Sequence, residues 1–275
     1  MRKMLLVPVG GLANRMRAVA SAYTLMRQVE GELRILWFRD WALNAPFGKL
    51  FEPLSEEGVS VREASFADLL VYDRPRRRNF HIPAFPQKLL FRSCVYEQEV
   101  GPYCYREAYW KEWASRGNVY MASYDQFMEY DNSVVQSIFC PVASVREEVE
   151  RRCGCFTDYT VGLHIRRTDN AVSIRQSPLE LFYACLDTEL EAHADLCIYL
   201  ATDSEEVKTD LRSRYGKRLL VAEAAADRGS VRGIQDAVAD MFTLSRTARI
   251  YGSSGSSFSE LAAQLGDVPL QVVSK

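Results

Sequence analysis

The chain has 275 residues, of which 48% are hydrophobic and 25% charged, with a formal net charge of −2. This composition is ordinary for a soluble globular protein of one large domain or two small ones. Its charge balance gives no overall electrostatic attraction to nucleic acid or to an anionic membrane. A local basic cluster, YDRPRRRNF at 72–80, is interpreted as an exposed loop in preference to a specific anion site.

The N-terminal sequence MRKMLLVPVGG is not expected to be a signal peptide, because its apolar run stops at Gly10 and arginines follow at 15 and 17. No stretch has the apolar length of a transmembrane helix, so we expect a cytoplasmic protein, with room for peripheral membrane contact. Seven scattered cysteines without a CxxC pair indicate reduced thiols. Three widely separated histidines predict no metal site.

The first predicted elements are a strand over 4–9, an amphipathic helix over 13–29 and a strand over 33–38, which together form a β-α-β opening. The sequence GGLANR joins the first strand to the helix. It fits either a plain tight turn or a loop built to touch a phosphate. Its candidate residues are Gly10, Gly11, Asn14 and Arg15.

From residue 40 to about 130 the periodicity breaks up, and prolines and aromatic residues are frequent. This composition predicts irregular loops with short helices. Such a region either shapes a surface that faces a substrate or merely covers the sheet.

After Cys153 the predicted strands and helices alternate regularly, which is typical of a parallel, doubly wound α/β sheet. The helix over 177–194 is expected to have Ser177 as its cap and Pro178 at its first position. In such sheets ligands bind beyond the carboxyl ends of the strands. The predicted strands are 159–165, 196–202, 218–223, 249–252 and 270–274, and the other helices are 204–216, 231–248 and 257–266.

The first strand of this half ends in HIRRTD, which places Arg166 and Arg167 at the expected ligand edge. Adjacent arginines there must face solvent, pair with a carboxylate or bind an anion. An arginine fork matches two phosphate oxygens, so Arg166 is the candidate that stabilises a diphosphate leaving group. Asp169 is the candidate that orients one of the two guanidinium groups, and a purely structural Arg–Asp pair is the alternative.

One further strand end and one helix carry polar candidates. Asp203 follows the second strand, where capping the next helix is the more ordinary role. Asp236 and Asp240 share a helix face and repel each other mildly, so we expect something to compensate them. Asp240 has the acceptors that guanine requires, and a solvated helix face is the alternative.

The last predicted turn, YGSSGSSFSELAA, leads small and hydroxyl residues into a helix N-terminus, where backbone N–H groups bind anions. Ser253, Ser254 and Ser256 add donors, although serine is also a common helix cap. The sequence contains neither GxGxxG nor GxxxxGK[ST], so the turn alone is weak support for a nucleotide.

Four motifs together resemble those of the GDP-fucose-dependent fucosyltransferases: GGLANR, VGLHIRRTD, LATDS and DMFTLSRTARIYGSSGSSFSELAA. The resemblance is strongest to the α1,6 enzymes that act on nodulation factors and N-glycans. The α1,2- and protein O-fucosyltransferases are more distant. The resemblance covers the loop near residue 10 and nearly all of 160–265. It implies a GT-B-like α/β fold, with two Rossmann-like lobes and parallel sheets facing across a cleft. The expected lobes are an acceptor-side lobe, 1–150, and a nucleotide-sugar-binding lobe, 151–275.

The resemblance also implies roles. Arg166 would contact the diphosphate, and His164 and Asp240 would lie around the guanine. Ser253 and Ser254 would line the nucleotide site. Gly10 and Gly11 would let backbone approach the diphosphate and sugar. The implied reaction is an inverting, metal-independent transfer of fucose from GDP-fucose to a glycan, glycolipid or peptide hydroxyl.

One departure from the family pattern concerns the general base. The α1,6 enzymes have a lysine straight after the motif's aspartate and an acidic residue shortly beyond, whereas this chain continues with Asn170 and AVSI. Asp40 and Asp169 are the candidate substitutes. Two alternatives therefore stay open: a transferase for another GDP-sugar or nucleotide-sugar, and a non-catalytic relative that binds a nucleotide or glycan.

Overall fold

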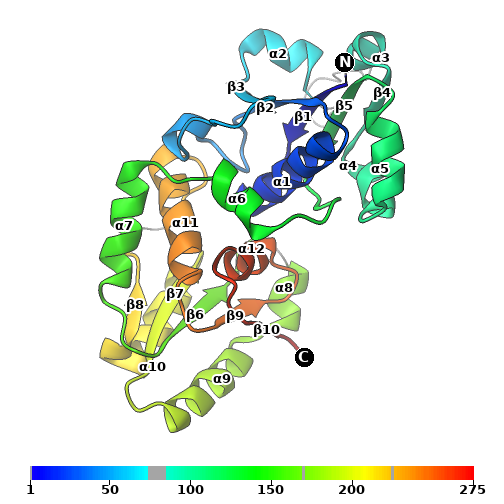
Figure 1. Ribbon diagram of the computed structural model, residues 1–275. Helices are drawn as coiled ribbons and strands as arrows, with labels where there is room; N and C mark the ends of the chain where they lie inside the picture. The colour runs from blue at the N-terminus through cyan, green and yellow to red at the C-terminus, as the bar shows by residue number, and fades with distance from the viewer. Residues whose placement is uncertain (1, 74–84, 169–170, 224–225) are drawn as a thin grey trace. The chain divides into compact units, whose positions relative to one another are not determined.

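The computed structural model describes residues 2–73, 85–168, 171–223 and 226–275 (Figure 1). Its contacts divide the chain into two compact units, Met1–Cys140 and Pro141–Lys275, here called unit 1 and unit 2. Helix α7 (Ala143–Cys153) packs against α11 (Val231–Leu244) of unit 2. The unit boundary therefore lies before α7, ahead of the position 150 expected from the sequence.

Unit 1 is a five-stranded parallel sheet with strand order β3-β2-β1-β5-β4. Its strands are β1 (Lys3–Pro8), β2 (Glu32–Trp37), β3 (Val59–Glu63), β4 (Ser93–Val95) and β5 (Asn118–Ser123). Its helices are α1 (Leu12–Gln28), α2 (Phe66–Val71), α3 (Phe85–Leu90), α4 (Glu97–Val100), α5 (Glu107–Ala114) and α6 (Asn132–Ile138), with 3-10 turns at Phe47–Lys49 and Gly101–Tyr103.

The region 40–130 is more regular than its sequence predicts, because it contains β3, β4 and β5. β3 has no fully buried residue and β4 is only three residues long, so neither gives a strong apolar pattern. β5 is buried from Val119 to Ser123, and it pairs with β1 across more than a hundred residues of chain. That pairing is a long-range contact without a local sequence signal.

Unit 2 is a second five-stranded parallel sheet, with strand order β10-β9-β6-β7-β8. Its strands are β6 (Thr160–Ile165), β7 (Cys197–Thr202), β8 (Leu219–Val221), β9 (Ile250–Ser253) and β10 (Leu270–Val273). Besides α7 and α11 its helices are α8 (Ala171–Gln176), α9 (Leu179–Ala192), α10 (Glu205–Tyr215) and α12 (Ser257–Gly266), with a 3-10 turn at Gly216–Arg218.

The two faces of this sheet have different partners. Val161, Leu163 and Ile165 of β6 pack with residues of α9 and α10 in one hydrophobic core. Gly162 points to the opposite face, where a Cβ atom would lie 2.8 Å from side-chain atoms of both Leu244 and Thr247. Alternation along β6 therefore buries α9 and α10 against one face and brings the end of α11 close to the other.

These two parallel sheets with their helices confirm the expected α/β class with two Rossmann-like units. None of the helices in the described parts of the chain combines the length and apolar character needed to cross a bilayer. All seven cysteines lie in the described part, and each carries a free thiol.

Candidate functional site

His164 lies at the end of β6 with only 8% of its surface exposed. Its ring stacks on Phe258, with centroids 4.8 Å apart, and Nδ1 lies 3.3 Å from the Ser256 hydroxyl. Burial lowers the pKa of His164 to about 4, with Asp203 acting against the shift and Arg166 acting with it. The imidazole is therefore neutral at pH 7, and the side chain joins the end of β6 to the start of α12.

Arg166 and Arg167 follow β6 directly but have different surroundings. The Arg167 guanidinium donates to the backbone carbonyls of Ser177, at 2.8 Å, and Ile174, at 3.5 Å. Arg167 therefore holds the α8–α9 connection, and its expected contact with the nucleotide-sugar stays a prediction. Arg166 is half-buried, and its backbone N–H donates to Ser253 Oγ at 3.1 Å.

Asp203, after β7, accepts from the backbone of the loop that follows β6. The N–H of Arg167 donates at 2.7 Å and the Thr168 hydroxyl at 2.6 Å. The cap of α10 is instead Ser204, whose hydroxyl accepts from Val207 N–H. The capping alternative for Asp203 is therefore wrong, and its carboxylate fixes the loop that carries Arg166.

The serines at the end of β9 and just after it form hydrogen bonds with neighbouring strands and loops. Ser253 and Ser256 are each 1% exposed, and Ser253 Oγ donates to the carbonyl of His164 at 3.3 Å. The backbone N–H of Ser254 donates to the Ser177 hydroxyl at 2.8 Å. Ser177 is therefore not the cap of α9, which begins at Leu179 with Pro178 in the cap position.

The first turn of α12 follows this turn. Its N-cap residue is Ser256, but the Ser256 side chain makes no capping hydrogen bond because its hydroxyl lies against His164. The helix N-terminus thus keeps the backbone N–H groups that favour an anion. It lies at the carboxyl edge of the sheet beside the end of β6, which carries Arg166.

In unit 1, Arg15 is completely buried. Its guanidinium donates to the carbonyls of Gly10, at 2.8 Å, and Phe38, and it pairs with Asp40 at 3.0 Å. The sequence indicated a donor contact for Arg15 and a base role for Asp40. The structure places both in a buried ion pair that fixes the glycine loop to the end of β2, and their expected roles in binding and catalysis stay predictions.

The glycine loop itself remains open on one side. Gly10 has φ of +81°, which disfavours other residues, and a Cβ atom there would lie 3.1 Å from the Asn14 side chain. Gly11 has ordinary backbone angles, and no described atom lies within 4 Å of the position of a Cβ atom. The fold of unit 1 therefore requires glycine at position 10, and it leaves space beside position 11.

Asp240 lies in a charged network on the α11 side of the unit 2 sheet. Its Oδ1 accepts from Arg152 at 2.8 Å and from the Tyr199 hydroxyl at 2.6 Å. Arg152 also pairs with Asp236 at 3.0 Å. The expected compensation of the two aspartates is therefore supplied by an arginine on α7.

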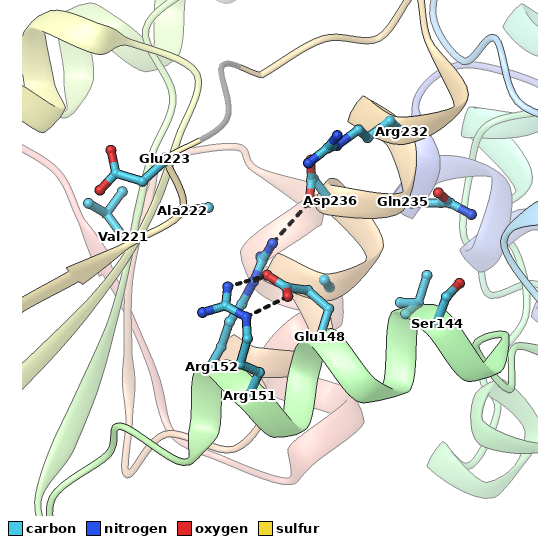
Figure 2. Close-up of a pocket in the computed structure, with 12 residues that line it drawn as sticks. Ser144, Glu148, Arg151, Arg152, Val221, Ala222, Glu223, Arg232, Gln235 and Asp236 are labelled. Carbon is cyan, nitrogen blue, oxygen red and sulfur yellow. Dashed lines mark hydrogen bonds and ion pairs between the residues drawn. The ribbon is translucent and has the colours of Figure 1, made fainter.

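A pocket of about 520 Å³ lies next to this network, between α7, α11 and the residues that end β8. Figure 2 shows Arg151 and Arg152 meeting Glu148, with Arg152 reaching across to Asp236. The end of β8 and the start of α11 place this pocket toward the carboxyl edge of the sheet. Its size is in the range of small-molecule sites.

Sequence reasoning missed Asp125, which follows β5 next to the glycine loop. The backbone joins the two, since Val9 N–H donates to the Ser123 carbonyl at 2.9 Å. Burial raises the pKa of Asp125, opposed by Arg17, and its Oδ2 accepts no hydrogen bond within the described residues. Recognising β5 as a strand would have marked Asp125 as a residue at a carboxyl edge.

Asp169 and the arginines at 74–78 lie outside the described residues. Within the described ranges no three His, Cys, Asp or Glu side chains are grouped so as to hold a metal ion. Metal-independent transfer stays a prediction.

Comparison by sequence finds no match, either with a protein-family model or with a curated protein. Comparison by structure finds several. NodZ alpha-1,6-fucosyltransferase co-crystallized with GDP is 19% identical, with a TM-score of 0.68 over 98% of this chain and 93% of that one. A mutant of FUT1 from Arabidopsis thaliana in complex with GDP is 12% identical, with a TM-score of 0.65 over 98% of this chain and 70% of that one.

POFUT1 in complex with GDP-fucose is 10% identical, with a TM-score of 0.58 over 98% of each chain. At these identities the comparisons show a shared fold. The chain thus has the two-unit α/β fold of these fucosyltransferases.

Proposed function

We propose that the protein is a glycosyltransferase that transfers fucose from GDP-fucose to a hydroxyl acceptor. The observation that carries this proposal is the convergence of Arg166, the Ser253 turn and the start of α12 at one sheet edge. An arginine and a helix N-terminus together favour a diphosphate. The fold is that of NodZ structures co-crystallized with GDP and soaked with GDP-fucose.

In this proposal the nucleotide lies along the carboxyl edge of unit 2. The diphosphate binds at Arg166 and the α12 N-terminus, while Asp203 and Arg167 hold the surrounding loop. The guanine binds beside Asp240, whose carboxylate can accept from both the ring N–H and the exocyclic amino group. The neighbouring pocket supplies the space for the base.

The proposed chemistry is an inverting displacement. The acceptor hydroxyl attacks the anomeric carbon as GDP leaves, and the positive charge of Arg166 stabilises the charge that develops on the diphosphate. The glycine loop would approach the diphosphate and sugar through its backbone, with space for that approach beside Gly11. No step in this scheme requires a metal.

For the general base we propose Asp125. Asp40 is held in a buried pair with Arg15, whereas Asp125 lies at the carboxyl edge of unit 1 with a raised pKa. A carboxylate with a raised pKa is a better proton acceptor. The Asp125→Asn variant should lose about a hundredfold or more in transfer rate with unchanged GDP affinity. If Asp40→Asn instead loses this much of the transfer rate while Asp125→Asn stays fully active, the base is Asp40.

A donor panel tests the function. Release of GDP or UDP is followed with GDP-fucose, GDP-mannose and UDP-glucose, in the presence of a mixture of oligosaccharide, glycolipid and peptide acceptors. The proposal expects turnover with GDP-fucose. Turnover only with GDP-mannose or UDP-glucose supports a transferase for another sugar. Tight GDP binding without turnover of any donor supports the non-catalytic relative.

A further inference from the structure

Arg152 joins three acidic side chains inside unit 2. Its Nε donates to Glu148 at 2.7 Å, one terminal nitrogen donates to Asp236 at 3.0 Å, and the other donates to Asp240 at 2.8 Å. The Arg152 side chain is only 5% exposed. The guanidinium is therefore held in one orientation, with bonded partners on both α7 and α11 (Figure 2).

The two oxygens of Asp240 have different surroundings. Oδ1 accepts one hydrogen bond from Arg152 and one from the Tyr199 hydroxyl. These two bonds use both acceptor sites of a carboxylate oxygen. Within the described residues, every hydrogen bond to this side chain ends on Oδ1. The side chain is 21% exposed, and no described group donates a hydrogen bond to Oδ2, which leaves this oxygen to accept from a ligand.

The charge on Asp240 depends on its neighbours. Burial raises its pKa to about 6, and Asp236 on the same helix also raises it. Arg152 from α7, Tyr199 from β7 and Lys208 from α10 lower it. Lys208 forms an ion pair with Glu205 at 2.7 Å. Arg152 is therefore the principal cation bonded directly to Asp240.

We infer that Arg152 is a positioning residue for guanine recognition, holding Asp240 ionised and turned so that Oδ2 faces the base. This inference rests on the proposed function. The ring N–H and the 2-amino group of guanine are both donors, and only the ionised carboxylate offers acceptors to both. Neutralising Arg152 leaves Asp240 protonated at neutral pH, and one of these two bonds is then lost.

The test is the affinity for GDP, IDP and inorganic pyrophosphate, measured by calorimetry from about pH 5.5 to 8.5 on the wild type and Arg152→Met. In the wild type, GDP affinity should fall as the pH drops through the pKa of Asp240. In Arg152→Met this fall should move up by about two pH units, with a loss of about tenfold in GDP affinity at pH 7. The preference for GDP over IDP should shrink, because IDP lacks the 2-amino group, and pyrophosphate affinity should not change.

Arg246→Met is the matched control, because Arg246 also pairs with a carboxylate of α7, Glu150 at 2.7 Å, and lies outside the pocket lining. It should bind GDP like the wild type. If Arg152→Met does not fold, Tyr199→Phe removes the other donor to Oδ1 and should shift the pH dependence in the same direction.

The outcomes separate the two proposals. A wild type that binds pyrophosphate but not GDP contradicts the proposed function, and this inference falls with it. If the wild type binds GDP but the pH dependence of Arg152→Met is unshifted, the role of Arg152 is contradicted and the proposed function is not. Where Arg152→Met does not fold, an unshifted pH dependence in Tyr199→Phe has the same meaning. A parallel loss of GDP and pyrophosphate in folded Arg152→Met also contradicts the role of Arg152, since that loss reports a general disturbance of the site.

Discussion

Arg166 and Arg167 are adjacent in the chain but have different surroundings. The sequence predicts an anion site at the end of β6, and either arginine fits that prediction. Only the position of the α8–α9 connection distinguishes them, because it offers backbone carbonyls to Arg167. That connection lies about ten residues further along the chain, and its fold around Arg167 leaves no local pattern.

This difference predicts opposite phenotypes for the two alanine variants. Arg166→Ala should lose GDP binding, because the positive charge proposed to contact the diphosphate is removed. Arg167→Ala should lose about 1–3 kcal/mol of stability, because its charged hydrogen bonds to a half-buried backbone are removed. Urea unfolding and GDP titration of both variants measure these effects. Unimpaired GDP binding by Arg166→Ala would exclude it from the diphosphate site.

His164 makes a separate prediction about pH. Its folded pKa of about 4 lies below the unfolded value of 6.5, so the unfolded chain binds more protons between these values. Stability contributed by the neutral ring is present above pH 6.5 and is lost as the pH falls toward 4. Asp240 acts oppositely, because its raised pKa favours the folded state as the pH falls from 6 toward 4.

The His164→Gln variant isolates the contribution of this histidine to the pH dependence of stability. The difference in unfolding free energy between wild type and variant should change by up to about 3 kcal/mol between pH 7 and 4, with the wild type losing more. Denaturant unfolding at several pH values measures it. A constant difference across this range would show that the ring has the same pKa in the folded and unfolded protein.

At the scale of elements, glycines 162 and 11 provide a matched pair. A methyl group at Gly162 would press on Leu244 and Thr247, whereas at Gly11 it meets no described atom. Gly162→Ala should therefore lose about 1–3 kcal/mol of stability through overpacking. Gly11→Ala should keep its stability and lose affinity for GDP-fucose, because the added methyl group occupies the space proposed for the ligand.

Thermal unfolding and a GDP-fucose titration of both variants distinguish these effects. Full affinity in Gly11→Ala would remove the glycine loop from the donor site. Stability close to that of the wild type in Gly162→Ala would mean that the end of α11 is not packed tightly on β6.

The sequence predicted the five strands of unit 2 and helices α9 to α12 to within a few residues, because strong helical periodicity alternates there with short apolar strands, but it did not predict α7 or α8. It failed at α9, where Ser-Pro before an acidic turn is a typical cap sequence. The Ser177 hydroxyl instead accepts from Ser254 N–H. A competing partner from another strand end overrode the local signal.

For the whole molecule, alternation in the second half was sufficient to predict the α/β class. The first half was harder, since β1 pairs with both β2 and the distant β5, and the intervening chain is rich in short elements. The compensation of Asp236 and Asp240 was also expected from sequence. Its source, Arg152, is more than eighty residues away and could come only from the packing of α7 on α11.

The central claim is that unit 2 binds a guanine nucleotide through Arg166, and a thermal-shift titration tests it most directly. Wild type and Arg166→Ala are each heated with GDP, GDP-fucose, UDP and ADP. At a hundred times its dissociation constant, a ligand adds about 2.7 kcal/mol of stability. The account predicts that GDP and GDP-fucose alone raise the midpoint of the wild type and that Arg166→Ala loses the effect. An equal or larger shift with UDP, or no shift with any guanine nucleotide, would contradict it.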